Sequence, residues 1–147
     1  LIAPNVTPTS DQLRGTPFDP APLVNKNNGN NGLNNLVVSP DGRMVAMALS
    51  NGLVNLYDSN TGKLFSSFTA HQGAITSLNF SPDGRYLATT GVDRAVKLWD
   101  TTSWRNLATL RLVEPSITPF LVEWLPDNKT LALAAGYGNT LLWRALS

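Results

Sequence analysis

A four-residue motif recurs along the chain at a regular interval, and this recurrence limits the folds open to the chain more than any other feature. Ser39-Pro40-Asp41-Gly42 returns 42 residues later as Ser81-Pro82-Asp83-Gly84, and 44 residues after that in a weaker form as Leu125-Pro126-Asp127-Asn128. In each copy the residue 17 positions after the proline is aromatic: Tyr57, Trp99 and Trp143. Three copies at a period of forty-odd residues indicate one structural unit repeated side by side.

Each repeat has the pattern of four short strands. In the second repeat we expect these strands at residues 74–80, 86–91, 95–99 and 105–112. Pro82-Asp83-Gly84 predicts a turn between the first two, because proline presets the backbone and glycine accepts a positive φ. The second strands of the other repeats, residues 45–49 and 131–135, are continuous apolar runs, which predicts sheets buried on both faces. No segment favours a helix, so we expect an all-β chain.

The first 33 residues differ in composition from the rest of the chain. They contain five prolines and an Asn- and Gly-rich run at residues 25–32. Such a segment disfavours regular structure, so we expect residues 1–33 to be a linker or an extended arm, anchored by Leu23-Val24. The repeats then divide residues 34–147 into three units, at about 34–73, 74–115 and 116–147.

The second repeat resembles the WD-repeat family. The resemblance rests on elements from His71 to Asp100: His71, Phe80-Ser81-Pro82-Asp83-Gly84, Leu87-Ala88-Thr89, Asp93 and Leu98-Trp99-Asp100. It extends over residues 34–147 in weaker form. Members of this family build β-propellers of four-stranded blades, usually four to eight of them. The resemblance therefore implies a partial propeller of three four-stranded antiparallel blades, with an irregular N-terminal segment.

The resemblance also implies a polar network inside the second blade. In it the indole of Trp99 donates to the hydroxyl of Thr89, this hydroxyl bonds His71, and His71 bonds the carboxylate of Asp93. A buried indole N–H and a buried carboxylate each need a partner, which makes the arrangement physically reasonable. The flanking repeats carry other residues at these positions: Met47, Asn51 and Tyr57 in the first, Leu133 and Tyr137 in the third. We therefore expect the outer blades to be held by packing alone.

Binding residues, where present, are expected in the loops at one end of the blades. The family resemblance implies that this end carries Ser50, Asn51, Gln72, Val92, Arg94, Pro119 and Tyr137. Arg94 and Tyr137 are of the residue types favoured at protein interfaces, although each is equally compatible with an ordinary solvated loop. Trp104, in a turn at the opposite end, is expected to pack on the neighbouring blade or, if exposed, to contact a partner.

Catalytic and cofactor chemistry finds no support in the sequence. The chain has no cysteine and a single histidine, His71, which the polar network already engages. No phosphate-binding glycine motif or metal-ligand spacing is present, so we expect no enzyme, no cofactor and no metal. The net charge is +1 without a Lys/Arg cluster, which argues against nucleic-acid and membrane partners. Lack of cysteine does not fix the compartment, although a cytoplasmic protein is favoured.

Three blades cannot close a ring, and each outer blade is expected to leave an apolar face uncovered. The remaining blades would come from the same parent chain, a second copy or another subunit. The repeats end after a third strand, so we expect the C-terminal part of a longer propeller. The favoured function is a non-catalytic scaffold that binds a protein or peptide. The alternative is a regulatory or sensor module of a larger enzyme, with a protease, kinase or NTPase domain upstream.

Overall fold

The computed structural model describes residues 32–114 and 116–146, which form short antiparallel strands and one 3-10 turn, η1 (Gly136–Gly138). The strands are β1 (Leu33–Val38), β2 (Met44–Leu49), β3 (Leu53–Asp58), β4 (Leu64–Thr69), β5 (Ile75–Phe80), β6 (Tyr86–Gly91), β7 (Ala95–Asp100), β8 (Asn106–Arg111), β9 (Pro119–Trp124), β10 (Thr130–Ala135) and β11 (Asn139–Arg144). The expectation of an all-β chain is confirmed. No helix among these residues has the length and apolar character needed to cross a membrane.

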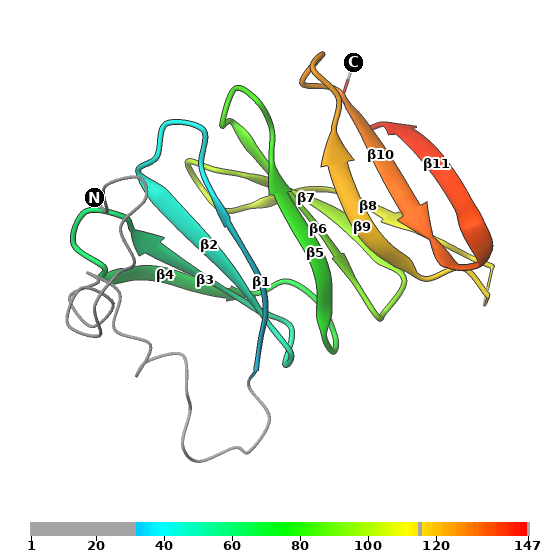
Figure 1. Ribbon diagram of the computed structural model, residues 1–147, viewed down its shortest axis with the longest axis horizontal. Helices are drawn as coiled ribbons and strands as arrows, with labels where there is room; N and C mark the ends of the chain where they lie inside the picture. Colours follow the sequence, from blue (N-terminus) through cyan, green and yellow to red (C-terminus); the bar gives the residue numbers. More distant parts are fainter. Residues whose placement is uncertain (1–31, 115, 147) are drawn as a thin grey trace, which may run out of the picture.

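The strands form three separate sheets that lie side by side (Figure 1). We call them blade 1 (β1-β2-β3-β4), blade 2 (β5-β6-β7-β8) and blade 3 (β9-β10-β11), and every pairing within them is antiparallel. The sheets do not close into a ring, in agreement with a partial propeller.

Blade 3 has three strands in the described residues, in agreement with a last repeat that ends after its third strand. In blades 1 and 2 a turn after the third strand leads back into a fourth, β4 or β8. After β11 the described chain continues only through Ala145 and Leu146, and the backbone N–H groups of both donate to the carbonyl of Lys129. The outer edge of β11 therefore has no paired strand among the described residues.

The recurring Ser-Pro-Asp-Gly motif builds the turn between the first two strands of blades 1 and 2. Ser39 Oγ donates to Asp41 Oδ1 at 2.6 Å, and Ser81 Oγ donates to Asp83 Oδ1 at 2.7 Å. Gly84 adopts φ 74°, a left-handed conformation that glycine takes without steric cost. In blade 3 the turn lacks the serine, and Asp127 instead accepts a bond from the hydroxyl of Thr130. The turn of blade 3 is thus stabilised by a threonine–aspartate hydrogen bond in place of the serine–aspartate bond of the other blades.

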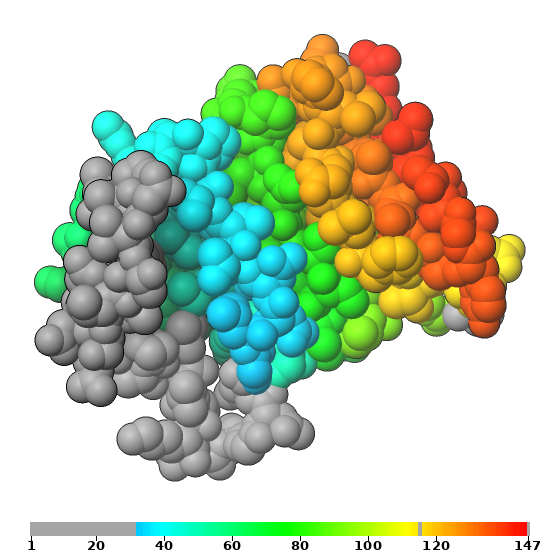
Figure 2. All heavy atoms as spheres, viewed as in Figure 1, coloured from blue at the N-terminus to red at the C-terminus, as the bar shows by residue number. Residues whose placement is uncertain are grey.

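Two apolar cores join the blades, and each contains side chains of blade 2. The core between blades 1 and 2 consists of Ala46, Ala48, Val54, Leu56, Ala70, Ile75, Leu78, Phe80, Leu87 and Trp99. The core between blades 2 and 3 consists of Ala88, Val96, Leu98, Val122, Trp124, Leu131 and Leu133. Blade 2 is therefore buried on both faces. Figure 2 shows the blades as adjoining bands of cyan, green and orange without a gap between them.

The first strand of each blade lies beside the first strand of the next, and polar bonds connect them. Asn34 Nδ2 in β1 donates to the carbonyl of Ile75 in β5 at 3.1 Å. One blade further, Thr76 Oγ1 donates to the carbonyl of Pro119 in β9 at 2.8 Å, and Trp124 Nε1 donates to the carbonyl of Asn79 at 3.1 Å. These bonds fix neighbouring blades in register.

The first strand of blade 1 begins at Leu33, inside the segment expected to be a linker. The rest of that segment, including Leu23-Val24, lies outside the described residues apart from Gly32. The outer face of blade 1, expected to be uncovered, has Val45, Met47 and Tyr57 buried in a cluster of their own. On the same face Leu36 and Val38 remain about half exposed. The outer face of blade 1 is therefore only partly exposed.

Candidate functional site

Four polar side chains of blade 2 lie in one continuous chain of hydrogen bonds. Trp99 Nε1 donates to Thr89 Oγ1 at 3.0 Å, and Thr89 Oγ1 lies 2.8 Å from His71 Nε2. At the other side of the imidazole, His71 Nδ1 lies 2.9 Å from Asp93 Oδ1. Thr89, His71 and Trp99 are buried, while Asp93 is partly open to solvent. The structure thus brings together all the residues that the sequence assigns to this network.

The chemistry of the end groups fixes where each proton lies. A carboxylate only accepts, so His71 Nδ1 carries a proton and donates it to Asp93. An indole only donates, so Thr89 Oγ1 accepts from Trp99 and directs its own hydrogen toward His71 Nε2. Neutral His71 satisfies every partner in this arrangement. A second proton on Nε2 would leave the hydroxyl of Thr89 facing two donors.

Burial favours this neutral form. It lowers the pKa of His71 below its ordinary value of 6.5, more strongly than the carboxylate of Asp93 raises it. For Asp93, burial alone would raise the pKa, but hydrogen bonds from His71, Gln72 N and Ala95 N outweigh it and lower the pKa below 3.8. A neutral imidazole and an ionised carboxylate therefore face each other near neutral pH.

The network also fixes the connection between blades 1 and 2. The carbonyl of Gly52 accepts bonds from the N–H groups of Ala70 and His71, and Gln72 N donates to Asp93 Oδ2. Gly91 lies so close to the imidazole that a Cβ there would approach the ring to 2.7 Å. This close enclosure suits a structural role, since a general base needs access to a substrate.

The flanking blades lack the network. Met47 and Leu133 are buried where Thr89 lies in blade 2, and neither can accept an indole hydrogen. Blade 1 nevertheless contains a polar pair of its own, in which Ser67 Oγ donates to Asn55 Oδ1 at 2.6 Å. Trp143 of blade 3 packs against the core between blades 2 and 3. Packing alone therefore does not account for blade 1, contrary to expectation.

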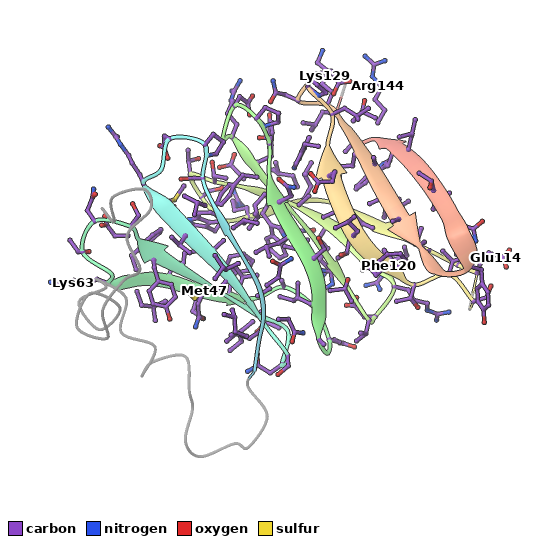
Figure 3. The ribbon with its side chains drawn as sticks, in the orientation of Figure 1. Met47, Lys63, Glu114, Phe120, Lys129 and Arg144 are labelled. Atoms are coloured by element: carbon purple, nitrogen blue, oxygen red, sulfur yellow. The ribbon has the colours of Figure 1, made fainter. Side chains whose placement is uncertain are left out.

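The loops at one end of the blades form a continuous surface, here called the loop face. It comprises residues 50–52, 70–74, 92–94, 112–114, 116–118 and 136–138, and backbone hydrogen bonds join the loops within each blade. Val92 N donates to the carbonyl of Ala74, Leu112 N to that of Arg94, and Gly136 N to that of Thr118. In Figure 3 this end carries Glu114, while Lys129 and Arg144 lie at the opposite end.

Two residues of the loop face stand out by their backbone conformation. Arg94 has φ 63° and Tyr137 has φ 62°, both in the left-handed region that favours glycine. Aligning the repeats on their prolines places Arg94 at the position that Gly52 and Gly138 occupy in the other blades. Tyr137 is 89% exposed, the most exposed large apolar side chain in the described residues. Such strained residues concentrate at binding and functional sites.

The other candidate residues differ in accessibility. Gln72 and Asn51 are exposed, and Val92 is half exposed beside Gly73. Ser50 is partly buried and accepts a bond from Gly32 N through its hydroxyl. Pro119 is buried as the first residue of β9, and its carbonyl accepts from Thr76, so it does not contribute to the exposed loop face.

Trp104 packs on the neighbouring blade. It lies in the turn between β7 and β8 with φ 55°, at the position that Gly62 occupies in blade 1. Its ring stacks on Phe68 of β4 with centroids 5.9 Å apart, and Phe68 in turn contacts Trp99 at 4.5 Å. The side chain is therefore part of the contact between blades 1 and 2.

Phe120 was not singled out from the sequence, yet it is 54% exposed on the first strand of blade 3. Alignment of the repeats on their prolines places it at the position of Asn34 and Thr76, both of which reach across to the next blade. The sequence signal that could have identified Phe120 is the aromatic residue at a repeat position that is polar in the other two blades.

Within residues 32–114 and 116–146 no group of three or more His, Asp or Glu side chains could hold a metal ion. Residues 62–100 match the family model described as WD domain, G-beta repeat. That range covers β4 to β7, including His71, Thr89, Asp93 and Trp99. No curated protein matches the chain.

Proposed function

We propose that the chain, in which residues 62–100 match the WD-repeat family model and the strands form consecutive antiparallel blades, is a non-catalytic scaffold whose loop face binds a protein or peptide. WD repeats generally serve as protein-interaction scaffolds and are typically non-catalytic. In the proposal further blades complete the ring, and the loop face recognises the partner.

The observation that carries the proposal is the exposed pair Tyr137 and Arg94 on the loop face. Left-handed backbone at a non-glycine residue costs on the order of 1–3 kcal/mol, and at the position of Arg94 the other two blades have Gly52 and Gly138. The strain is thus tolerated where a side chain faces the surface. Tyrosine and arginine are also the residue types that dominate the energetics of protein interfaces.

The surroundings of this pair suit a neutral or weakly charged peptide. Val92 and Val113 are 50% and 86% exposed on the same loop face and add apolar area to it. Among the described residues, the guanidinium of Arg94 forms no hydrogen bond or ion pair. It is therefore available to a carboxylate or carbonyl of the partner.

The test is selection of random peptides displayed on phage against the full chain, followed by affinity measurement with variants. Tyr137→Gly and Arg94→Gly remove the side chains while relieving the left-handed strain, so both variants should remain folded. Selected peptides should lose about tenfold or more in affinity for either variant. Leu107→Ala, on the outer strand β8, is the matched control and should bind unchanged. Failure to enrich peptides, or equal binding by all variants, would refute the proposal.

A further inference from the structure

Basic side chains that are scattered along the sequence gather at the end of the blades opposite the loop face. We call this end the turn face; it comprises residues 40–43, 59–63, 82–85, 101–105, 126–129 and 144–146. Its basic residues are all exposed: Arg43, Lys63, Arg85, Arg105, Lys129 and Arg144. The loop face has one basic residue, Arg94. Figure 3 shows Lys129 and Arg144 together at the turn face.

Three of these residues, here called the basic row, occupy one repeat position, three residues after the proline of each turn: Arg43, Arg85 and Lys129. The turns that carry them touch one another. A Cβ on Gly84 would lie 3.6 Å from Cδ of Pro40, so the turns of blades 1 and 2 are in van der Waals contact. Asp83 N donates to Asn128 Oδ1 at 2.9 Å and joins the turns of blades 2 and 3. The basic row therefore runs across three neighbouring blades.

The backbone of the basic row is fixed from both sides. Each N–H group donates to the side chain of the aspartate two positions earlier, at 3.0, 3.1 and 2.9 Å for Asp41, Asp83 and Asp127. Each carbonyl accepts a bond from the next turn of the same blade, through the N–H groups of Ser59, Thr101 and Ala145. The three side chains thus start from equivalent and well-fixed positions. Less order has to be imposed on this surface when a partner binds.

The aspartates of the same turns do not form ion pairs with the basic row. Ser39 Oγ donates to Asp41 Oδ1, and Thr130 Oγ1 donates to Asp127 Oδ2. These hydrogen bonds are the main cause that lowers the pKa of Asp41 and of Asp127 below 3.8, so both carboxylates are ionised but bound within their own turns. Among residues 32–114 and 116–146, no hydrogen bond or ion pair engages the charged groups of the basic row.

We propose that the turn face is a second binding surface, which takes an acidic segment of a partner protein by pairing its carboxylates with the basic row. Arginine forms two parallel hydrogen bonds with a carboxylate, and complementary charge steers such segments to the surface. The turn face lies at the other end of the blades from the loop face. The inference therefore goes beyond the proposed function and does not depend on it.

The alternation of charge on the turn face favours an acidic peptide over other anions. An aspartate stands two residues before each member of the basic row, so a dense line of phosphates would meet carboxylates as well as cations. A peptide carries its carboxylates at separate positions, which can match the basic row. The one aromatic residue of the turn face, Trp104, stacks on Phe68 rather than being available to a lipid bilayer.

The test measures binding of a short fluorescent peptide of alternating glutamate and serine to the full chain, by anisotropy at low salt. Binding is expected, and the affinity should fall as salt is added, because exposed ion pairs are screened. The triple variant Arg43→Gln, Arg85→Gln and Lys129→Gln should bind the peptide about tenfold or more weakly. Circular dichroism checks that this variant is folded.

Two arginines of blade 2 give a matched pair of single variants, which also serve if the triple variant does not fold. Arg85→Glu and Arg111→Glu change the net charge equally, and both residues are exposed, but Arg111 lies on β8 away from the turn face. Arg85→Glu should weaken binding by about fivefold, and Arg111→Glu by less than about twofold. No binding of the peptide at low salt, or an equal loss in both variants, would overturn the inference.

Two further comparisons identify the class of partner and the surface. Tighter binding of the chain to a short DNA duplex, or to vesicles that contain phosphatidylserine, than to the acidic peptide would overturn the proposal of a protein partner. Tyr137→Gly changes the loop face alone and should bind the acidic peptide as the wild type does. Loss of the phage-selected peptides with retention of the acidic peptide in all turn-face controls would overturn the proposed function and leave this inference standing.

Discussion

Gly52 of blade 1 lies so close to the backbone of His71 that a Cβ at Gly52 would approach the carbonyl oxygen of His71 to 2.0 Å. The same glycine accepts the N–H groups of Ala70 and His71 through its own carbonyl. The loop of blade 1 is therefore packed directly on the residue that leads into the polar network of blade 2. The contact of blade 1 with blade 2 and the position of His71 in the polar network therefore depend on the same glycine.

Gly52→Ala should lower the free energy of unfolding by at least about 3 kcal/mol, because it adds a backbone clash to the cost of left-handed alanine. Gly138→Ala is the matched control. Gly138 has a similar φ of 75° but no atom within 4 Å of an added Cβ, so the loss should be about 1 kcal/mol. Urea unfolding followed by tryptophan fluorescence measures both. Equal losses would show that the contact with His71 does not constrain the loop.

Asp93→Ala should destabilise the protein by about 2–3 kcal/mol, since it removes the acceptor of a buried imidazole N–H. Asp93 also accepts from Gln72 N and Ala95 N, so its loss loosens two loops. Asp127→Ala removes bonds within an exposed turn only and should have a smaller effect. Thermal unfolding of the two variants compares them directly. A comparable shift in Tm would argue against the network.

The free energy of unfolding should fall as the pH drops below about 6.5. The pKa of His71 in the folded protein lies below 6.5, so in this window the unfolded chain binds a proton that the folded chain does not. The loss continues until the pH reaches the folded pKa. Asp93, whose folded pKa lies below 3.8, contributes stability above that value and loses it as the pH falls further.

His71 is the only histidine in the chain, which makes this pH dependence assignable. His71→Gln should be less stable at pH 7 and should show little change in unfolding free energy between pH 7 and pH 5.5. Urea titrations at several pH values give the comparison. If the unfolding free energy of His71→Gln depends on pH as steeply as that of the wild type, another group is responsible for the pH dependence.

Trp104→Gly should destabilise the protein by about 2 kcal/mol even though glycine relieves the left-handed backbone, because the stacked contact with Phe68 is lost. Arg94→Gly changes another left-handed residue at a position without aromatic packing, and its stability should stay the same or rise slightly. Comparison of the unfolding midpoints of the two variants distinguishes the effect of relieving backbone strain from the effect of losing side-chain packing. A gain in stability for Trp104→Gly would contradict the role of the stack.

Strand boundaries in blade 2 could be predicted to within one residue, since Pro82-Asp83-Gly84 and Asp93 mark its turns. The all-β class followed from the repeat. The residues of the polar network could be named by resemblance because a buried indole and a buried carboxylate need partners. The roles of the loop-face residues stay a proposal.

Other features depended on tertiary contacts that a local pattern does not contain. Pro119 reads as a loop residue, yet β9 begins with it and Thr76 of blade 2 bonds its carbonyl. The sequence does not show why a tryptophan occupies the left-handed turn position of Trp104, because the contact with Phe68 comes from the neighbouring blade. The exposure of Phe120 results from its place in the last blade, since the same strand position is occupied by bonded residues in the other two.

Both apolar cores contain side chains of the middle sheet, and this arrangement bears on how the protein comes apart. Neither outer sheet has a large core without the strands β5 to β8, so disorder in these strands would remove the support of both neighbours at once. Local opening confined to one side is therefore disfavoured. Denaturation of the described region is expected to be a single cooperative event rather than a stepwise peeling of sheets.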